Sequence, residues 1–333
     1  MNRLAWLARR LVFSVVALWI VFTLTFAFVT LSGDPGDSAV AYAVAAELAG
    51  TGADGEEIEA QAEAAVQQYR DARNLDEPVT SRYVSWSWNL LTLDWGYSYE
   101  RPVPVTELLA ERLQITALYA IPAMGISLGG GVWLGTYAAA GRHRRFARFL
   151  TGSSYAVWGI PNFLIASILL LTLPLSIRPG LTGWEFEQSM VAYDNLRRVV
   201  LPAIILGTGL MAVQARYVRT QFLETTSEHF VRTHEAMGSD RVMRTRHVLR
   251  VAAVPLTTLF VSTLLGVLVL NVIVIEYVFD IPGFGLLTYD AIVNRDLPVI
   301  VGTTLVVAVV GIVGNFLQDL SYAILDPRIR LED

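Results

Sequence analysis

Apolar residues occur along this chain in long stretches that contain no charged side chain. A bilayer span needs about 20 predominantly apolar residues, so each stretch is a candidate transmembrane helix. The stretches are Leu11–Leu31, Gln114–Gly141, Phe149–Ile177, Val199–Ala215, Val251–Ile275 and Leu297–Gln318. The shortest, the fourth, is expected to continue past Arg216 toward Val218, because an arginine near a helix end can extend to the interface. The pattern predicts an all-α integral membrane protein with about six transmembrane helices.

Composition supports a membrane protein. Hydrophobic residues make up 54% of the 333 residues and charged residues only 17%, whereas soluble domains carry about 25% charged residues. The chain has no cysteine, which excludes disulfides, thiolate metal sites and cysteine nucleophiles. The first apolar stretch is longer than the core of a secretory signal, so we expect it to be retained as a helix.

Arginine placement predicts the orientation, because cytoplasmic loops carry an excess of basic residues. Arginines occur before the first stretch, after the second, after the fourth and in the carboxyl-terminal tail, and with six spans all four places lie on one side. We therefore expect a multi-pass plasma-membrane protein with both termini in the cytoplasm. The arginines in these places include Arg3, Arg9, Arg10, Arg142, Arg144, Arg145, Arg148, Arg232, Arg241, Arg244, Arg246, Arg250, Arg328 and Arg330.

Four parts of the chain follow from this topology. Residues 1–32 form the first transmembrane helix, and residues 33–112 form an acidic extracellular region in which Glu56–Leu75 is expected to be helical. Residues 113–325 form a five-helix core, which includes a cytoplasmic loop at 219–250. Residues 326–333 are a cytoplasmic tail.

Small residues cluster in the second predicted span. Small residues allow helix backbones to approach closely in lipid, so we interpret the cluster as a helix-packing face, with a pore-lining role as the alternative. The glycines are Gly125, Gly129, Gly130, Gly131 and Gly135.

The longest cytoplasmic loop carries a pattern of two short helices. Glu228–Met237 is a short polar helix, and Gly238 can end it because glycine adopts the left-handed conformation of helix ends. Asp240 can cap a second helix over Arg241–Arg250. Two helices joined at a glycine form a compact projection that could dock in the groove of a partner, although the same loop could serve only to fix topology.

This loop resembles the EAA loop of ABC importer permeases, in the form found in the dipeptide and oligopeptide type. His234 stands where that family usually has alanine. The matching residues are Val231, Arg232, Thr233, Glu235, Ala236, Gly238, Arg246, His247, Leu249, Arg250 and Pro255. Further segments resemble the family in the same order along the chain: Leu75–Tyr99, Pro104–Tyr119, Glu276–Gly302 and Leu325–Arg330.

The resemblance implies a type I ABC importer permease that forms half of a translocation path. It implies a second, homologous permease subunit, two cytoplasmic ATPase subunits and an extracellular solute-binding protein as partners, with membrane lipid around them and no nucleic acid. No cofactor is expected on this chain, because ATP and Mg²⁺ would bind to the ATPase subunits. The residues implied to couple to the ATPases are Arg232, Thr233, His234, Glu235, Ala236, Gly238 and Arg241.

The last outer loop, Tyr277–Pro298, is a candidate gate. Proline followed by glycine favours a tight turn, so the loop could hold a short re-entrant or gate helix, or only a turn. Its candidate residues are Asp280, Pro282, Gly283 and Gly285. Glu276 and Asp319, at the ends of the fifth and sixth spans, are expected at the interface rather than in a proton relay.

The chain lacks the sequence patterns that other classes of protein would carry. The chain has no GxxxxGK[ST] phosphate loop, no HExxH and no GxSxG, so an enzyme is not expected. An ion-driven secondary transporter would carry charges near the membrane midplane or broken helices in inverted repeats, and it stays the alternative function. A role as a receptor or scaffold would leave the EAA-like loop without an explanation. Di- or oligopeptide is the expected substrate, with a nickel complex or an oligosaccharide as alternatives.

Overall fold

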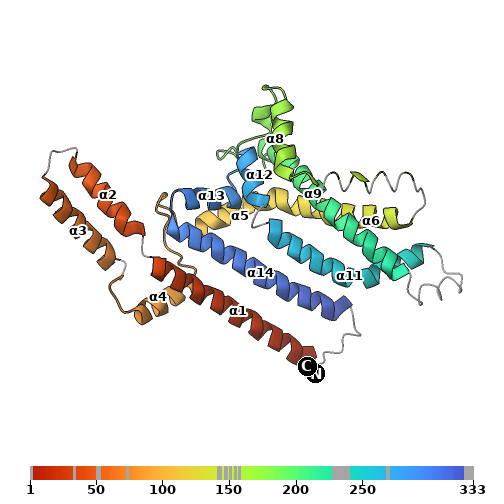
Figure 1. Ribbon diagram of the computed structural model, residues 1–333, viewed down its shortest axis with the longest axis horizontal. Helices are drawn as coiled ribbons and strands as arrows, with labels where there is room; N and C mark the ends of the chain where they lie inside the picture. Colours follow the sequence, from red (N-terminus) through yellow and green to blue (C-terminus); the bar gives the residue numbers. More distant parts are fainter. Residues whose placement is uncertain are drawn as a thin grey trace. The chain divides into compact units, whose positions relative to one another are not determined.

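The structure is a computed structural model in which the described residues fold almost entirely into helices (Figure 1). It describes residues 3–32, 35–49, 54–72, 75–140, 159–226, 241–267 and 271–325, with isolated positions between 145 and 156. Within these ranges β-structure is limited to an isolated bridge between Tyr97 and Pro104. The all-helical fold class is therefore confirmed.

The helices are distributed over two compact units. The central unit comprises Met1–Ser14, Leu109–Asp290 and Val306–Asp333, and the amino-terminal unit comprises Val15–Leu108 and Ala291–Leu305. The elements, in chain order, are α1 (Arg3–Ser32), α2 (Pro35–Ala49), α3 (Gly55–Ala72), α4 (Val79–Leu91), α5 (Val105–Gly125), the π-helical turn η1 (Ile126–Gly130), α6 (Gly131–Ala140), α8 (Asn162–Thr172), the 3₁₀ turn η2 (Arg178–Gly180), α9 (Tyr193–Thr226), α11 (Arg241–Gly266), α12 (Val272–Phe279), α13 (Phe284–Val293) and α14 (Leu297–Leu325).

Four helical segments of the described chain are long and apolar enough to cross a membrane: Ala5–Leu31, Val105–Ala139, Tyr193–Thr226 and Leu297–Ser321. They correspond to the first, second, fourth and sixth predicted spans. Helices α12 and α13 together pass the same test but are bent by 89°, so they form either a broken span or a re-entrant loop. The chain therefore has the helices of a multi-pass membrane protein.

The third and fifth predicted spans are each described only in part. Helix α8, in the third, begins at Asn162, directly after Pro161; proline disfavours helical backbone in the residue before it and suits a helix start. In the fifth, the described helices are α11, which extends to Gly266, and α12, which begins at Val272.

The central unit is built around the packing of α6 against α9. A Cβ atom added to Gly135 would lie 2.5 Å from the Ala215 carbonyl oxygen and 2.7 Å from Val218 Cβ, and one added to Gly131 would collide with Gln214 of α9. The helix-packing interpretation is confirmed for this part of the glycine cluster. Gly125 and Gly129 have open space around them among the described residues.

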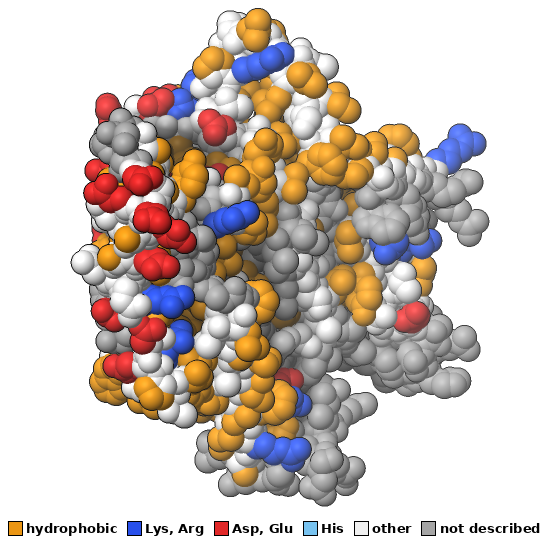
Figure 2. Space-filling model, turned by 60° about the vertical axis from the view of Figure 1, so that its left-hand side comes forward, with side chains coloured by type: hydrophobic (Ala, Val, Ile, Leu, Met, Phe, Trp, Pro, Cys, Tyr) orange, Lys and Arg blue, Asp and Glu red, His pale blue; other side chains and the backbone are white. Residues whose placement is uncertain are grey.

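The amino-terminal unit contains a packed pair, α1 and α4, and the pair α2 and α3. Tyr83 of α4 stacks edge-on against Phe26 of α1 with ring centroids 5.2 Å apart, and its hydroxyl lies 2.7 Å from Thr23 Oγ1. Helix α3 occupies the region expected to be helical, and its exposed side chains are rich in glutamate, including Glu56, Glu57 and Glu59. Figure 2 shows acidic side chains gathered on one part of the surface, while hydrophobic side chains cover much of the rest.

A buried carboxylate fixes a loop of this unit to the start of α14. Asp296 is 3% exposed, and it accepts hydrogen bonds from the hydroxyl of Ser98 and from the backbone N–H groups of Tyr99 and Glu100. Asn294 donates to Glu100 at 3.0 Å. The loop that precedes α5 is therefore held by charge-assisted hydrogen bonds, which are stronger than neutral ones.

Candidate functional site

The turn between α12 and α13 gathers the residues predicted as a gate. Helix α12 ends at Asp280, which has the left-handed backbone conformation (φ 54°, ψ 43°) and donates its N–H to the Glu276 carbonyl. Aspartate tolerates this conformation better than most residues. Pro282 and Gly283 complete the turn, and α13 begins at Phe284. The predicted loop thus contains a ten-residue helix after a sharp turn rather than a turn alone.

The side chain of Glu276 lies inside this bend with no exposed surface. Its Oε1 accepts hydrogen bonds from Thr116 Oγ1 at 2.6 Å and from the Tyr119 hydroxyl at 2.9 Å, both on α5. Its Oε2 accepts from the backbone N–H of Leu286 at 2.8 Å. Burial of a carboxyl group is costly unless it is hydrogen-bonded, and here three donors from two other helices supply those bonds.

Glu276 also occupies the amino-terminal end of α13. Leu286 is the third residue of that helix, so its N–H has no partner within the helix. The Glu276 carboxyl group fills that role and lies at the positive end of the helix dipole. One side chain therefore connects α5, α12 and α13, and it is fully buried inside the protein.

Two of the predicted gate glycines are required by close packing. A Cβ atom added to Gly283 would collide with Glu276 Oε1 and lie 2.6 Å from Thr116 Oγ1. A Cβ atom added to Gly285 would lie 2.5 Å from the backbone nitrogen of Ile273 in α12. Because α13 approaches α12 and α5 so closely, any larger residue would push the bent pair apart.

Arg112 connects the turn to a second segment. This α5 side chain is 8% exposed; its Nη1 donates to the Pro282 carbonyl at 2.9 Å, and its guanidinium lies 5.1 Å from the ring centroid of Phe186. Arginine over an aromatic face is a favourable cation–π contact. Phe186 belongs to the segment between α8 and α9, so that segment and the turn meet at Arg112.

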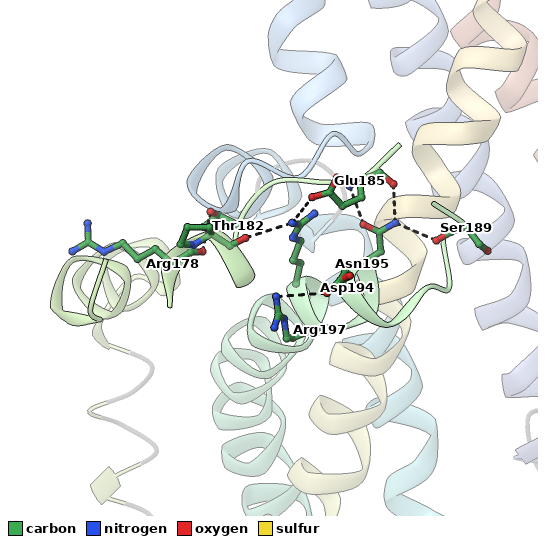
Figure 3. A network of polar contacts seen from close by, with 9 residues as sticks. Arg178, Thr182, Glu185, Ser189, Asp194, Asn195 and Arg197 are labelled. Atoms are coloured by element: carbon green, nitrogen blue, oxygen red, sulfur yellow. Dashed lines mark hydrogen bonds and ion pairs between the residues drawn. The ribbon is translucent and has the colours of Figure 1, made fainter. Parts of the chain in front are cut away.

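A buried amide holds the α8–α9 segment in shape (Figure 3). Asn195 of α9, which has no exposed surface, accepts from the backbone N–H of Glu185 at 3.0 Å and donates to the carbonyls of Glu185 and Ser189, both at 3.1 Å. Arg198 donates to Glu185 Oε1 at 2.7 Å. Gly183 donates its N–H to the Phe279 carbonyl at 2.9 Å, which attaches the segment to the end of α12.

The other predicted site residues are not part of this arrangement. Arg232, Thr233, His234, Glu235, Ala236 and Gly238 lie outside the described residues. Helix α11 begins at Arg241, where the second helix of the loop was predicted to start, and the Arg241 side chain is also outside the described part. Asp319, expected at an interface, is 3.0 Å from Arg10 and partly exposed.

Sequence reasoning missed the residues that hold the turn together, which are Glu276 with its donors Thr116 and Tyr119, and Arg112, which donates to the Pro282 carbonyl. It also missed Asn195, which holds the α8–α9 segment in shape. One signal was present, since Glu276 is a lone carboxyl group in the apolar run of α12, and such residues are usually paired or functional. The side chains that bond to Glu276 come from α5, and no periodicity in the chain relates those positions to α12.

Long apolar helices, a bent helix pair and a surface rich in hydrophobic side chains define a multi-pass helical membrane protein. Comparison with known proteins shows to which family of membrane proteins the chain belongs. The chain belongs to the family of binding-protein-dependent transport system inner membrane components, whose family model matches residues 131–331.

Two similar proteins of known name are also transport permeases, in agreement with the family match. The chain is 31% identical over 268 residues to the oligopeptide transport system permease protein AppB of Bacillus subtilis (strain 168), a match that covers 79% of this chain and 84% of the relative. It is 33% identical over 264 residues to the dipeptide transport system permease protein DppB of the same organism, covering 78% of this chain and 82% of the relative. The family resemblance found in the sequence is therefore confirmed.

Proposed function

We propose that this chain is the transmembrane permease subunit of an ATP-driven ABC importer, in which it forms half of the translocation path for a di- or oligopeptide delivered by an external binding protein. The observation that carries the proposal is the family match over residues 131–331. The peptide substrate rests on the names of the relatives, an oligopeptide and a dipeptide permease.

The proposed complex contains a second, homologous permease, two cytoplasmic ATPase subunits and an extracellular solute-binding protein. ATP and Mg²⁺ bind to the ATPases, and this chain holds no cofactor. The matched family acts with a binding protein by its description, which supports the external partner. The sequence contains no phosphate loop, and this supports the proposal that ATP hydrolysis belongs to another subunit.

The proposed topology has six spans with both termini in the cytoplasm. The arginine distribution supports it. So does the ion pair between Arg10 of α1 and Asp319 of α14, because it joins residues near the two ends of the chain within the central unit. In this topology the third span includes α8, and the fifth runs from α11 toward α12.

Two elements act in the proposed transport cycle. The loop that carries Arg232–Gly238 and Arg241 contacts the ATPases and transmits their closure. On the other side of the membrane, the α12–α13 turn with Asp280, Pro282, Gly283 and Gly285 is the gate. The Glu276 hydrogen bonds support this role, because they make α5, α12 and α13 one packed body that can shift as a unit.

The test is purification of the tagged chain after expression with its neighbouring transport genes, followed by mass spectrometry and reconstitution into liposomes. A second permease and ATPases should co-purify, and labelled dipeptide uptake should require ATP and the binding protein. Uptake that instead follows an imposed ion gradient, and stops with an ionophore, would favour the secondary transporter. ATP-dependent uptake of a nickel complex or an oligosaccharide, without peptide uptake, would correct the substrate alone.

A further inference from the structure

A cleft of about 210 Å³ opens in the amino-terminal unit between the end of α4 and the first turns of α14. Trp86, Trp95 and Asp94 line one part of it, and Leu90, Val301 and Leu305 line the other. None of the described residues that line it is basic. The cleft therefore combines two indole rings and a carboxylate with an apolar wall.

This combination of groups favours a cation. An ammonium group is attracted to the face of an indole, and more strongly to tryptophan than to other aromatic rings. The Asp94 carboxylate supplies a negative charge, and among the described residues nothing is hydrogen-bonded to it or paired with it. The cleft also lies at the carboxyl-terminal end of α4, which is the negative end of that helix.

The geometry of the two indoles is fixed by neighbouring groups. Trp95 Nε1 donates to the Leu90 carbonyl at 3.3 Å, so its ring lies against the end of α4. Trp86 packs against Phe26 of α1 with ring centroids 5.5 Å apart. A binding group that is already held in place loses less entropy when a ligand arrives.

The surroundings of the cleft indicate that the cation is part of a lipid head group. Val301 and Leu305 belong to the first turns of α14, a candidate membrane span, so the cleft lies near one end of that span. On α4, Val84, Trp88 and Leu91 form a stripe that is 67%, 67% and 65% exposed. An exposed apolar stripe with tryptophan on a short helix is typical of a helix that lies in the membrane interface.

We propose that this cleft binds the primary ammonium head group of an aminophospholipid such as phosphatidylethanolamine. The primary amine is preferred to a choline group because its N–H bonds can be donated to Asp94, which makes a charge-assisted hydrogen bond. The apolar wall receives the carbon chain next to the head group. The amino terminus of a peptide has the same ammonium chemistry, and the test separates the two sources. This proposal requires only that the chain lies in a membrane, so it stands apart from the transport function.

The test is native mass spectrometry of the full chain, purified with the subunits that accompany it, during titration with phosphatidylethanolamine or phosphatidylglycerol. Wild type should retain phosphatidylethanolamine in preference to phosphatidylglycerol, and Asp94→Asn should reduce that retention about tenfold, in the range of one hydrogen bond to a charged group. Trp95→Phe should reduce it less. Glu59→Gln, which changes an exposed carboxylate outside the cleft, should behave as wild type.

Three results would overturn the lipid assignment. Equal retention by wild type and Asp94→Asn, with unchanged thermal unfolding of the variant, would show that the carboxylate does not select the ligand. Release of the lipid by millimolar glycylglycine would assign the ammonium site to a soluble amine instead. A further variant, Asp94→Arg, should reverse the preference toward phosphatidylglycerol, and failure to do so would also contradict the proposal.

Discussion

At the scale of single residues, Glu276 is the most consequential side chain of the described structure. It is fully buried and accepts hydrogen bonds from Thr116, Tyr119 and Leu286. Thr116 also accepts from the backbone N–H of Phe284 at 2.8 Å, which closes a small network around the turn. The position of α13 therefore depends on one carboxyl group.

Replacement of Glu276 by alanine should loosen this turn. The change leaves three donors without an acceptor in a buried site, and such a loss costs about 1–3 kcal/mol for each unsatisfied group. We expect a clearly lower thermal midpoint for the purified protein and reduced uptake in reconstituted vesicles. Glu187→Gln, at an exposed carboxylate of the α8–α9 segment, is the matched control. A Glu276→Ala midpoint equal to that of the control would contradict the role assigned to Glu276.

At the scale of elements, the close approach of α6 to α9 is what positions the second and fourth spans. Gly131 and Gly135 permit it, because their missing side chains leave room for Gln214, Ala215 and Val218. The π-helical turn η1 directly before α6 is also at this contact, and π-helical turns occur frequently at functional sites.

Alanine at Gly135 should separate these helices, whereas alanine at Gly129 should be tolerated. At Gly135 the new methyl group would meet the backbone of Ala215, and overpacking of this kind costs about 1–3 kcal/mol. At Gly129 it would meet open space, and alanine stabilises a helix relative to glycine by about 0.5–1 kcal/mol. Thermal unfolding of both variants in the same detergent measures the difference, and equal midpoints would refute the packing argument.

At the scale of the whole molecule, the proposed topology can be tested directly because the chain has no cysteine. Single cysteines at Glu59 and at Glu332 should react differently with a membrane-impermeant maleimide in intact cells. We expect Glu59→Cys to be labelled and Glu332→Cys to be protected until the membrane is opened. The reverse pattern would invert the orientation, and labelling of both residues would require an odd number of spans.

The proposed coupling between the cytoplasmic loop and transport can be tested at Gly238. Gly238→Val should fix a different angle between the two predicted helices of the loop, because valine disfavours the left-handed conformation that glycine adopts at a helix end. ATP hydrolysis by the complex should continue while uptake is lost, with normal insertion in the membrane. Gly238→Ala is the milder comparison. Unchanged uptake by Gly238→Val would remove this glycine from the coupling mechanism.

Much of the fold could be read from the sequence because a bilayer constrains it so strongly. A span must be long, apolar and helical, and α1, α9 and α14 follow that rule so closely that their positions were predictable. The turn at Asp280, Pro282, Gly283 and Gly285 was also predictable, since proline and glycine mark a turn by their own backbone preferences. The partners of Glu276 could not be predicted, because nothing local indicates that Thr116 and Tyr119, some 160 residues away, donate to its carboxyl group.

The sequence by itself determined the class of the protein, its main helices and its family, because apolar length, arginine placement and ordered motifs are properties of the chain read in one dimension. The tertiary structure decided which of the polar residues meet. It buried Glu276 between three helices, joined Arg112 to Phe186 and Pro282, and brought Trp86, Trp95 and Asp94 together beside α14. Those contacts depend on how helices pack side by side, and packing brings together residues that lie far apart in the chain.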